Sequence, residues 1–220
     1  MNPNAAHEPI IKIENLYKKY GDNVVLDGFN LNLYQGENLV IMGKSGSGKS
    51  VMIKCLIGLE IPDSGTIEIM SQKLEHLSLK ALDEIRADIG FLFQGSALYD
   101  SMTVRENLEF PLRRHISKFG NVKDTLPLVE EALENVGLKN VIDLMPNELS
   151  GGMKRRVALA RTLILKPKII IYDEPTTGLD PITSKEIILL MKSVQEKYKT
   201  SSIIITHDVD CARVIANRMI

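Results

Sequence analysis

Hydrophobic and polar positions alternate in the N-terminal part of the chain. Residues 10–20 and 24–33 show this alternation on either side of a Gly21-Asp22 turn, and residues 66–70 form a shorter segment of the same kind. Alternation with a period of two places apolar side chains on one face of a strand, and a glycine turn is typical of a connection between neighbouring strands. We therefore predict antiparallel strands here, with one face exposed to solvent.

Four later segments are apolar with little interruption. They are residues 39–42, 89–93, 168–174 and 202–206, and segments with helical spacing, at residues 51–57, 79–87 and 181–198, separate them. Nearly continuous apolar runs are typical of strands buried on both faces, and alternation with helices is typical of a parallel sheet. The sequence therefore predicts a parallel sheet whose strands end at a common edge, where open α/β sheets bind ligands.

The pattern changes to a mainly helical one between residues 95 and 165. Thr103 and Glu106 have the spacing of a capping box that opens a helix, and residues 126–136 carry apolar side chains at helical spacing before Gly137 ends the helix. We predict a helical sub-domain at 95–165, inserted into an α/β body made of residues 1–94 and 166–220. The sequence contains no linker long enough to separate independent domains, so residues 1–220 are expected to form one domain.

Composition narrows the class of protein. The 220 residues are 44% hydrophobic and 25% charged, which is ordinary for a folded domain, and the formal net charge of -1 gives no electrostatic sign of a nucleic-acid partner. Cys55 and Cys211 both fall in apolar helical patterns, so we expect two buried thiols. No stretch approaches the ~20 consecutive apolar residues of a membrane-spanning helix, and the start lacks a signal-peptide pattern, so we expect a cytosolic chain.

The segment between residues 42 and 52 matches the pattern G-x-x-x-x-G-K-[ST]. Its residues are Gly43, Lys44, Ser45, Gly46, Ser47, Gly48, Lys49 and Ser50, and Val51 continues into the predicted helix. Glycines let the backbone N–H groups point inward, and the helix N-terminus adds about half a positive charge, so the loop is expected to bind a polyphosphate. Lys49 is expected to reach the β- and γ-phosphates and Ser50 to coordinate Mg²⁺. A Gly/Ser-rich surface turn is the alternative.

Polar residues stand at the ends of three predicted strands. We predict that Asp173 holds Mg²⁺, that Glu174 orients and polarises an attacking water, and that His207 hydrogen-bonds the γ-phosphate. Gln94 is a candidate contact for Mg²⁺ or for the attacking water. The alternatives are structural: a strand-end cap for Gln94, helix caps for the acidic pair, and a hydrogen-bonded structural imidazole for His207.

A second anion site is predicted near residue 150. Ser150 can cap a helix, and Gly151 and Gly152 expose the first N–H groups of that helix. Lys154 and Arg155, in its first turn, oppose the helix dipole at a cost of about 0.3–1 kcal/mol each unless an anion is present. One nucleotide loop and a separate phosphate reader on the same chain suggest head-to-tail subunits that complete each other's sites.

These motifs follow the order found in ABC-transporter ATPase subunits, which the chain resembles over nearly its whole length. The matching segments are residues 43–50 (Walker A), Gln94 (Q-loop), residues 149–152 (signature), residues 169–174 (Walker B), residues 178–180 (D-loop) and His207 (switch histidine). The resemblance implies a P-loop NTPase fold and a two-fold dimer of identical chains that closes around two Mg-ATP. Ser150, Gly151 and Gly152 would meet the partner's nucleotide, and Asp180 would link the two sites. Tyr20, taken alone a half-buried strand residue, matches the adenine-stacking aromatic.

A narrower resemblance is to the cassettes of Mla-type phospholipid transporters. It rests on residues 93–107, 110–112, 153–161 and 172–181, in which Met153 replaces the usual signature Gln and, because a thioether cannot donate a hydrogen bond, is expected to pack. The resemblance implies a peripheral protein on the inner face of the cytoplasmic membrane, held there by an integral permease that it contacts through a surface including residues 94–111.

Other functions stay open at this point. They are a cassette for another cargo, such as an amino acid or a lipoprotein, a soluble ABC-type ATPase acting on ribosomes or DNA, and a nucleotide-binding scaffold without hydrolysis. Such cassettes normally continue through further strands beyond Ile220, so we expect a C-terminal truncation that leaves domain completeness and dimer stability open.

Overall fold

The N-terminal strands form a sheet of their own. The computed structural model describes residues 8–44, 46–119 and 124–220. Strands β1 (Ile11–Tyr20), β2 (Asn23–Leu33), β4 (Ser64–Ile69) and β5 (Gln72–Lys73) pair in the order β2-β1-β4-β5, and all of these pairings are antiparallel. Gly21 adopts a positive φ of 58° in the turn between β1 and β2, which explains why a glycine is needed there. The predicted antiparallel strands and their turn are confirmed.

A second sheet is entirely parallel. Its strands are β6 (Ile89–Leu92), β7 (Ile169–Asp173), β8 (Ser201–Ile205), β3 (Asn38–Ile41) and β9 (Arg218–Met219), in that order across the sheet. Helices α1 (Lys49–Leu56), α2 (Leu79–Ala87), α6 (Pro181–Tyr198) and α7 (Val209–Ile215) connect or follow these strands. The carboxyl ends of β3, β6, β7 and β8 therefore meet at one edge, as predicted.

The prediction of full burial is wrong for β6. Strands β7 and β8 are buried along almost their whole length, whereas Ile89 and Phe91 in β6 are only half-buried. Burial alternates along β6, so only one of its faces is fully covered, and among the described residues this edge strand pairs with β7 alone.

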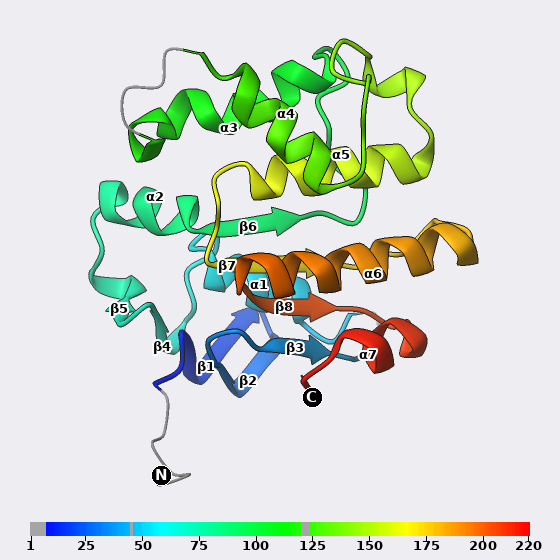
Figure 1. The fold of residues 1–220 in the computed structure, drawn as a ribbon. Helices are drawn as coiled ribbons and strands as arrows, with labels where there is room; N and C mark the ends of the chain where they lie inside the picture. Colours follow the sequence, from blue (N-terminus) through cyan, green and yellow to red (C-terminus); the bar gives the residue numbers. More distant parts are fainter. Residues whose placement is uncertain (1–7, 45, 120–123) are drawn as a thin grey trace, which may run out of the picture.

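Helices form a separate layer beyond the parallel sheet. This layer contains α3 (Val104–His115), the 3₁₀ turns η2 (Ile116–Phe119) and η3 (Pro146–Glu148), α4 (Leu126–Asn135) and α5 (Gly151–Leu163). Among the described residues of 95–165 there is no strand. Figure 1 shows α3 and α4 at the top of the molecule, with α5 lying between them and the sheet. The predicted capping box is present, since Thr103 N donates to Glu106 Oε2 (2.8 Å) and Glu106 N donates to Thr103 Oγ1 (3.2 Å).

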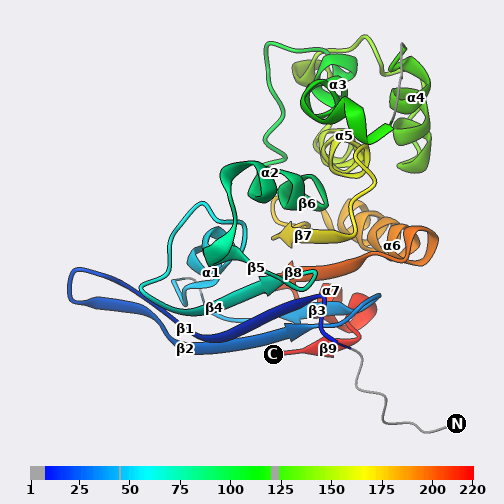
Figure 2. The ribbon, with the colours of Figure 1, turned by 90° about the vertical axis from the view of Figure 1, so that its left-hand side faces the viewer.

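Two hydrophobic cores hold the layers together. One lies between the antiparallel sheet, α1 and one face of the parallel sheet, and the other lies between the opposite face, α6, α7 and the helical layer. Figure 2 shows this stack of layers from the side. Both cysteines are buried in these cores as free thiols, as predicted.

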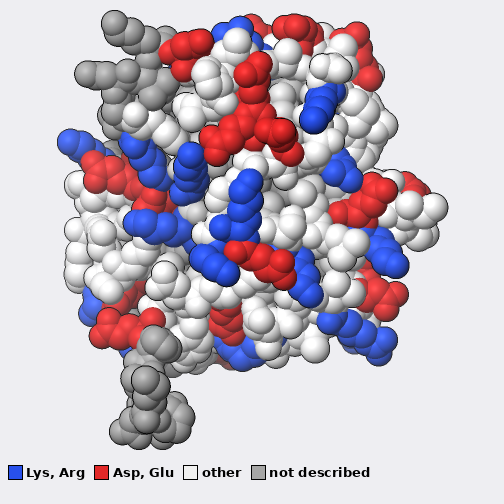
Figure 3. Space-filling view, viewed as in Figure 1, with Lys and Arg blue, Asp and Glu red and all other residues white. Residues whose placement is uncertain are grey.

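Ion pairs link the helical layer to α2. Arg114 pairs with Asp83 at 2.7 Å, and Lys118 pairs with Asp88, which also accepts Lys168 at 2.9 Å. Figure 3 shows basic and acidic side chains interspersed over this face of the molecule.

In the described part of the chain, no helix combines the length and the apolar composition that a membrane span requires.

Candidate functional site

The loop between β3 and α1 curls around its own lysine. Lys49 Nζ donates hydrogen bonds to Gly43 O (2.7 Å), Lys44 O (2.9 Å) and Ser47 Oγ (3.2 Å). A Cβ on Gly43 would lie 2.9 Å from Ser47 Oγ, so a larger residue there would disturb the curl. The arrangement holds a positive charge at the start of a helix, where anions bind well.

Gly48 is required by both conformation and space. Its φ is 87°, and a Cβ at this position would lie 2.7 Å from the backbone oxygen of Val25 on β2. An L-residue is strained at this φ, and the neighbouring atom is backbone that cannot rotate away. Ser45, which the motif also includes, lies outside the described residues.

A cavity of about 580 Å³ opens beside this loop and gathers most of the predicted site residues. Its walls include Gly43, Lys44, Gly46, Ser47, Gly48, Lys49, Ser50, Val51, Gln94, Asp173, Glu174 and His207. The carboxyl ends of β3, β6, β7 and β8 supply these residues, as expected for an open α/β sheet. Val25 and Ile205 also line the cavity and were not predicted, because neither carries a chemical group that marks it in the sequence.

The two carboxylates after β7 differ in their surroundings. Burial raises the pKa of the Asp173 carboxyl, and the charge of Glu174 raises it further, while the Lys49 ammonium acts in the opposite direction. Glu174 has a φ of 49°, its N–H donates to Ile205 O (2.9 Å), and its Oε2 accepts a hydrogen bond from Thr177 Oγ1 (3.1 Å). A non-glycine residue held at positive φ by such bonds is a feature of functional sites.

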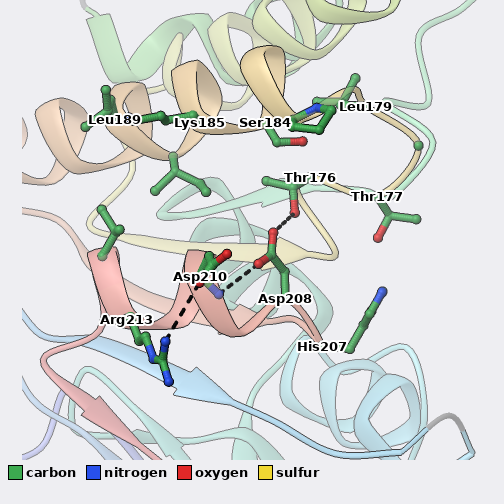
Figure 4. Close-up of a pocket in the computed structure, with 14 residues that line it drawn as sticks. Thr176, Thr177, Leu179, Ser184, Lys185, Leu189, His207, Asp208, Asp210 and Arg213 are labelled. Atoms are coloured by element: carbon green, nitrogen blue, oxygen red, sulfur yellow. Dashed lines mark hydrogen bonds and ion pairs between the residues drawn. The ribbon is translucent and has the colours of Figure 1, made fainter.

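His207 contacts Glu174 directly. Its Nδ1 lies 2.9 Å from Glu174 Oε2, and this hydrogen bond raises the pKa of His207. The segment that follows is fixed by Asp208, which accepts hydrogen bonds from Thr176 Oγ1 (3.2 Å) and from the first N–H groups of α7. Figure 4 shows Thr176, Thr177, His207 and Asp208 along a second cavity, of about 890 Å³, between α6 and α7.

The residues present suit Mg²⁺ held together with a polyphosphate. In the part of the chain that the structure describes, no group of three or more His, Cys, Asp or Glu side chains could hold a metal ion alone. Ser50 and Asp173 line the same cavity, however, and Mg²⁺ typically takes one or two protein oxygens and completes its shell with water and substrate phosphates. The donor set therefore fits a metal that arrives with its nucleotide.

Five predicted residues lie outside the walls of this cavity. Ser150 Oγ accepts from Met153 N (3.2 Å) and caps α5, while Asp180 Oδ1 accepts from Ile182 N (3.1 Å) and Thr183 N (3.0 Å) and caps α6. Gly151 and Gly152 begin α5, and a Cβ on Gly152 would lie 2.8 Å from Thr183 Cγ2. The structure thus keeps Ser150, Gly151, Gly152 and Asp180 together at the facing ends of α5 and α6, apart from the phosphate loop.

Tyr20 is the fifth of these residues. It ends β1 at the tip of the β1–β2 hairpin, its side chain is 46% exposed, and Lys18 Nζ lies 5.4 Å from the centre of its ring. Its exposed aromatic face leaves it able to stack on a planar group, although it does not line the cavity.

Two further findings concern α5. Met153 packs against the hydrophobic core, which confirms the expectation that its thioether packs. Arg155, predicted only as a basic residue in the first helical turn, is 4% exposed and reaches backbone oxygens beside the cavity. No pattern in the sequence marks this inward-facing guanidinium, because its partners are backbone oxygens of distant segments.

Known proteins resemble the chain in sequence and in fold. The family described as "ABC transporter" matches residues 26–177. The intermembrane phospholipid transport system ATP-binding protein MlaF of Haemophilus influenzae is 40% identical over 211 residues, which cover 96% of this chain and 79% of MlaF. The methionine import ATP-binding protein MetN of Clostridium tetani is 37% identical over 212 residues, and the chain spans only 65% of that relative's length.

Solved structures of ATP-binding cassettes also resemble the chain in fold. A dimeric structure of the ATP-binding cassette MJ0796, in a post-hydrolysis state bound to ADP and Pi, superposes with a TM-score of 0.81 at 37% identity, covering 93% of this chain and 90% of that chain. The cassette cbiO1 of Clostridium perfringens gives a TM-score of 0.83 at 31% identity, covering 96% of this chain and 83% of that chain.

Proposed function

The chain belongs to the ABC transporter family and is an ATP-hydrolysing subunit of such a transporter, and we propose that two copies of it close around two Mg-ATP to power a membrane permease. The observation that carries this proposal is the division of the predicted site. One set of residues surrounds the phosphate-loop cavity, and a second set, Ser150 to Gly152 with Asp180, lies outside its walls. A second copy, placed head to tail, would bring the second set to the first. The dimeric form of MJ0796 supports this arrangement.

Each residue around the cavity has a role that its position supports. The loop N–H groups and Lys49 would bind the phosphates, and Ser50, Asp173 and the candidate Gln94 would hold Mg²⁺. Mg²⁺, when bound, neutralises charge that develops on the phosphate oxygens. Glu174 accepts a hydrogen bond from the attacking water and polarises it. His207, which contacts Glu174 through Nδ1 at 2.9 Å, hydrogen-bonds the γ-phosphate. Tyr20 stacks on the adenine.

Two parts of the chain and one exposed surface would pass the closure of the dimer on to the permease. We propose an α/β body at residues 1–94 and 166–220 and a helical sub-domain at 95–165. A groove of about 410 Å³ lies at the edge of the sheet, where Phe93, Tyr99 and Phe110 are each more than 40% exposed. An aromatic surface of this kind suits a protein partner, and it falls within residues 94–111 and their neighbours, so it is the proposed permease contact. That contact would hold the chain on the inner face of the cytoplasmic membrane.

Phospholipid is the proposed cargo, because MlaF is 40% identical over nearly the whole chain. An amino acid is the second candidate, because MetN is 37% identical. Purification of the chain with its permease from membranes, followed by identification of the bound lipid or amino acid, separates the two cargoes.

Glu174→Gln tests the catalytic assignment. The amide keeps the size of the side chain but cannot act as a base, so phosphate release should fall by at least 100-fold while ATP binding and dimer closure persist. The measurement is Mg²⁺-dependent phosphate release beside binding of a fluorescent ATP analogue. Normal turnover in this variant would remove Glu174 from its role, and absence of Mg²⁺-dependent phosphate release from the unaltered chain with its permease would contradict the proposed function itself.

A further inference from the structure

Arg155 is a buried cation without an acidic partner. It sits one turn into α5, its side chain is 4% exposed, and burial lowers the pKa of its guanidinium. In the described part of the chain, no carboxylate oxygen lies within the 4.0 Å of an ion pair from it, and its Nε has no hydrogen-bond partner. A buried charge costs folding free energy unless hydrogen bonds or an opposite charge compensate it, so the hydrogen bonds of the Arg155 guanidinium are the feature to consider.

The guanidinium joins two backbone segments that carry predicted catalytic residues. Nη1 donates to Phe93 O (2.7 Å), directly before Gln94, and Nη2 donates to Thr177 O (3.2 Å). Thr177 in turn donates from Oγ1 to Glu174 Oε2 (3.1 Å). One side chain therefore connects α5 with the end of β6 and with the turn after the neighbouring strand β7.

Other side chains of α5 bind only the first of these segments. Thr162 Oγ1 donates to Phe91 O (3.1 Å), and Arg161 donates to Ser96 O (3.0 Å) and Ala97 O (2.8 Å). Residues 91–97 are thus attached to α5 at several points. Among these α5 side chains, Arg155 alone also reaches the turn that orients Glu174.

We propose that Arg155 is a positioning residue for ATP hydrolysis, which holds the Gln94 segment and the Glu174 turn at a fixed separation and ties both to the helix that begins with Ser150. This inference rests on the proposed function. A fork of two N–H donors fixes two acceptors relative to each other, which a single-headed lysine or an amide cannot do over the same span. Movement of α5 would then shift the Gln94 segment and the Glu174 turn together. Loss of the fork should leave ATP binding intact, because Arg155 does not line the cavity.

The test compares Arg155→Gln with Arg156→Gln in the full chain with its permease. Arg156 is the matched control, since it stands next on the same helix but donates to Val136 O (2.8 Å) and Glu186 Oε2 (2.9 Å), away from the cavity. We expect Arg155→Gln to lower kcat by about 10-fold or more, because misplacement of catalytic groups by about 1 Å can cost up to about 100-fold. The KM for Mg-ATP should stay within about threefold, and Arg156→Gln should change kcat by less than about twofold.

A second readout needs no turnover. In the nucleotide-free chain, NMR titration of His207 reports its contact with Glu174, so Arg155→Gln should shift the pKa of His207 toward its ordinary value and Arg156→Gln should not. If Arg155→Gln does not fold, Arg155→Lys keeps the charge and one of the two bonds, and its kcat should fall at least about threefold at unchanged KM.

Several results would overturn the inference. They are a folded Arg155 variant with unchanged kcat, a loss that appears in KM alone, an equal loss in Arg156→Gln, or a His207 titration that Arg155→Gln leaves in place. Hydrolysis by the unaltered chain together with any of these results would reject the role of Arg155 and leave the proposed function standing.

Discussion

Gly90 in β6 makes the tightest glycine contact between the sheet and α5. A Cβ at this position would lie 2.5 Å from Thr162 Cγ2, 3.1 Å from Pro167 Cγ and 3.2 Å from Thr162 O. Carbon atoms pack favourably at about 3.5–4.0 Å, so Gly90→Ala forces β6 and α5 apart by about 1 Å unless Thr162 moves. Thr162 is buried and bonded to Phe91 O and Ala158 O, which leaves it little freedom.

The expected loss of stability follows from these distances. Overpacking of a close-packed interior costs about 1–3 kcal/mol, and alanine in place of glycine in a strand returns about 0.5–1 kcal/mol. The balance is a net loss of between about 0 and 2.5 kcal/mol in the free energy of unfolding, centred near about 1 kcal/mol. For a chain of this size the central value corresponds to a fall of roughly 2–4 °C in Tm.

Thr162→Ser is the matched variant that should remove the collision at Gly90→Ala. It removes the Cγ2 methyl group that collides with the new Cβ and keeps the hydroxyl that bonds Phe91 O (3.1 Å) and Ala158 O (2.9 Å). Alone it should cost about 0.5–1.5 kcal/mol, like other losses of one buried methyl group. In the double variant the two costs should not add, and a favourable coupling of about 1 kcal/mol is expected.

Urea denaturation of the four proteins, followed by circular dichroism, measures this coupling. Additive losses would show that Thr162 does not limit the space at Gly90. A Gly90→Ala variant that is as stable as the unaltered chain and shows no coupling to Thr162→Ser would refute the close approach of β6 and α5.

Three further predictions concern the cavity. Burial and Glu174 raise the pKa of Asp173, so its ionised form costs stability at neutral pH, and Asp173→Asn should raise Tm at pH 7.5 and lose that advantage below the ordinary carboxyl pKa of about 3.9. The same variant should abolish Mg²⁺-dependent phosphate release, and a lower Tm at pH 7.5 would contradict the reasoning. The contact with Glu174 raises the pKa of His207 above its ordinary value of 6.5, so this contact should stabilise the protein at low pH and lose its effect as the pH rises through the folded pKa. NMR titration of Glu174→Gln should show the pKa of His207 returning toward 6.5. Lys49→Ala should reduce binding of a fluorescent ATP analogue by at least about 10-fold without loss of the circular dichroism spectrum, and unchanged affinity would remove Lys49 from phosphate binding.

Patterns within short segments predicted most of the fold, because hydrophobic spacing, turn residues and helix caps indicated the same elements. The helix at Pro181–Tyr198 has the predicted bounds, since Asp180 caps its start and Lys199, at a φ of 53°, ends it. The edge position of β6 escaped prediction, because strand order depends on pairings between residues far apart in the sequence. Its run of apolar residues resembles that of a central strand, and only the structure shows that no strand pairs with its outer side among the described residues.

The sequence also predicted that several candidate site residues meet at one edge of the sheet, and their chemical roles stay predictions. Gln94, Asp173, Glu174 and His207 each carry a polar group at the end of an apolar strand, and the parallel sheet brings them to one cavity. The role of Arg155 was missed, because its partners are backbone oxygens of distant segments and backbone atoms leave no mark in a sequence. The Nδ1 contact between His207 and Glu174 was missed as well, since it joins side chains that follow two different strands.

Completion of each site by a second copy can be measured through molecular mass. Glu174→Gln protein, saturated with Mg-ATP in the presence of its permease and then crosslinked, should give cassette pairs of twice the 24.6 kDa of one chain on a denaturing gel. It should give single cassettes when Ser150→Arg is added. Single cassettes in Glu174→Gln under saturating Mg-ATP, with the permease present, would contradict a site shared between two copies.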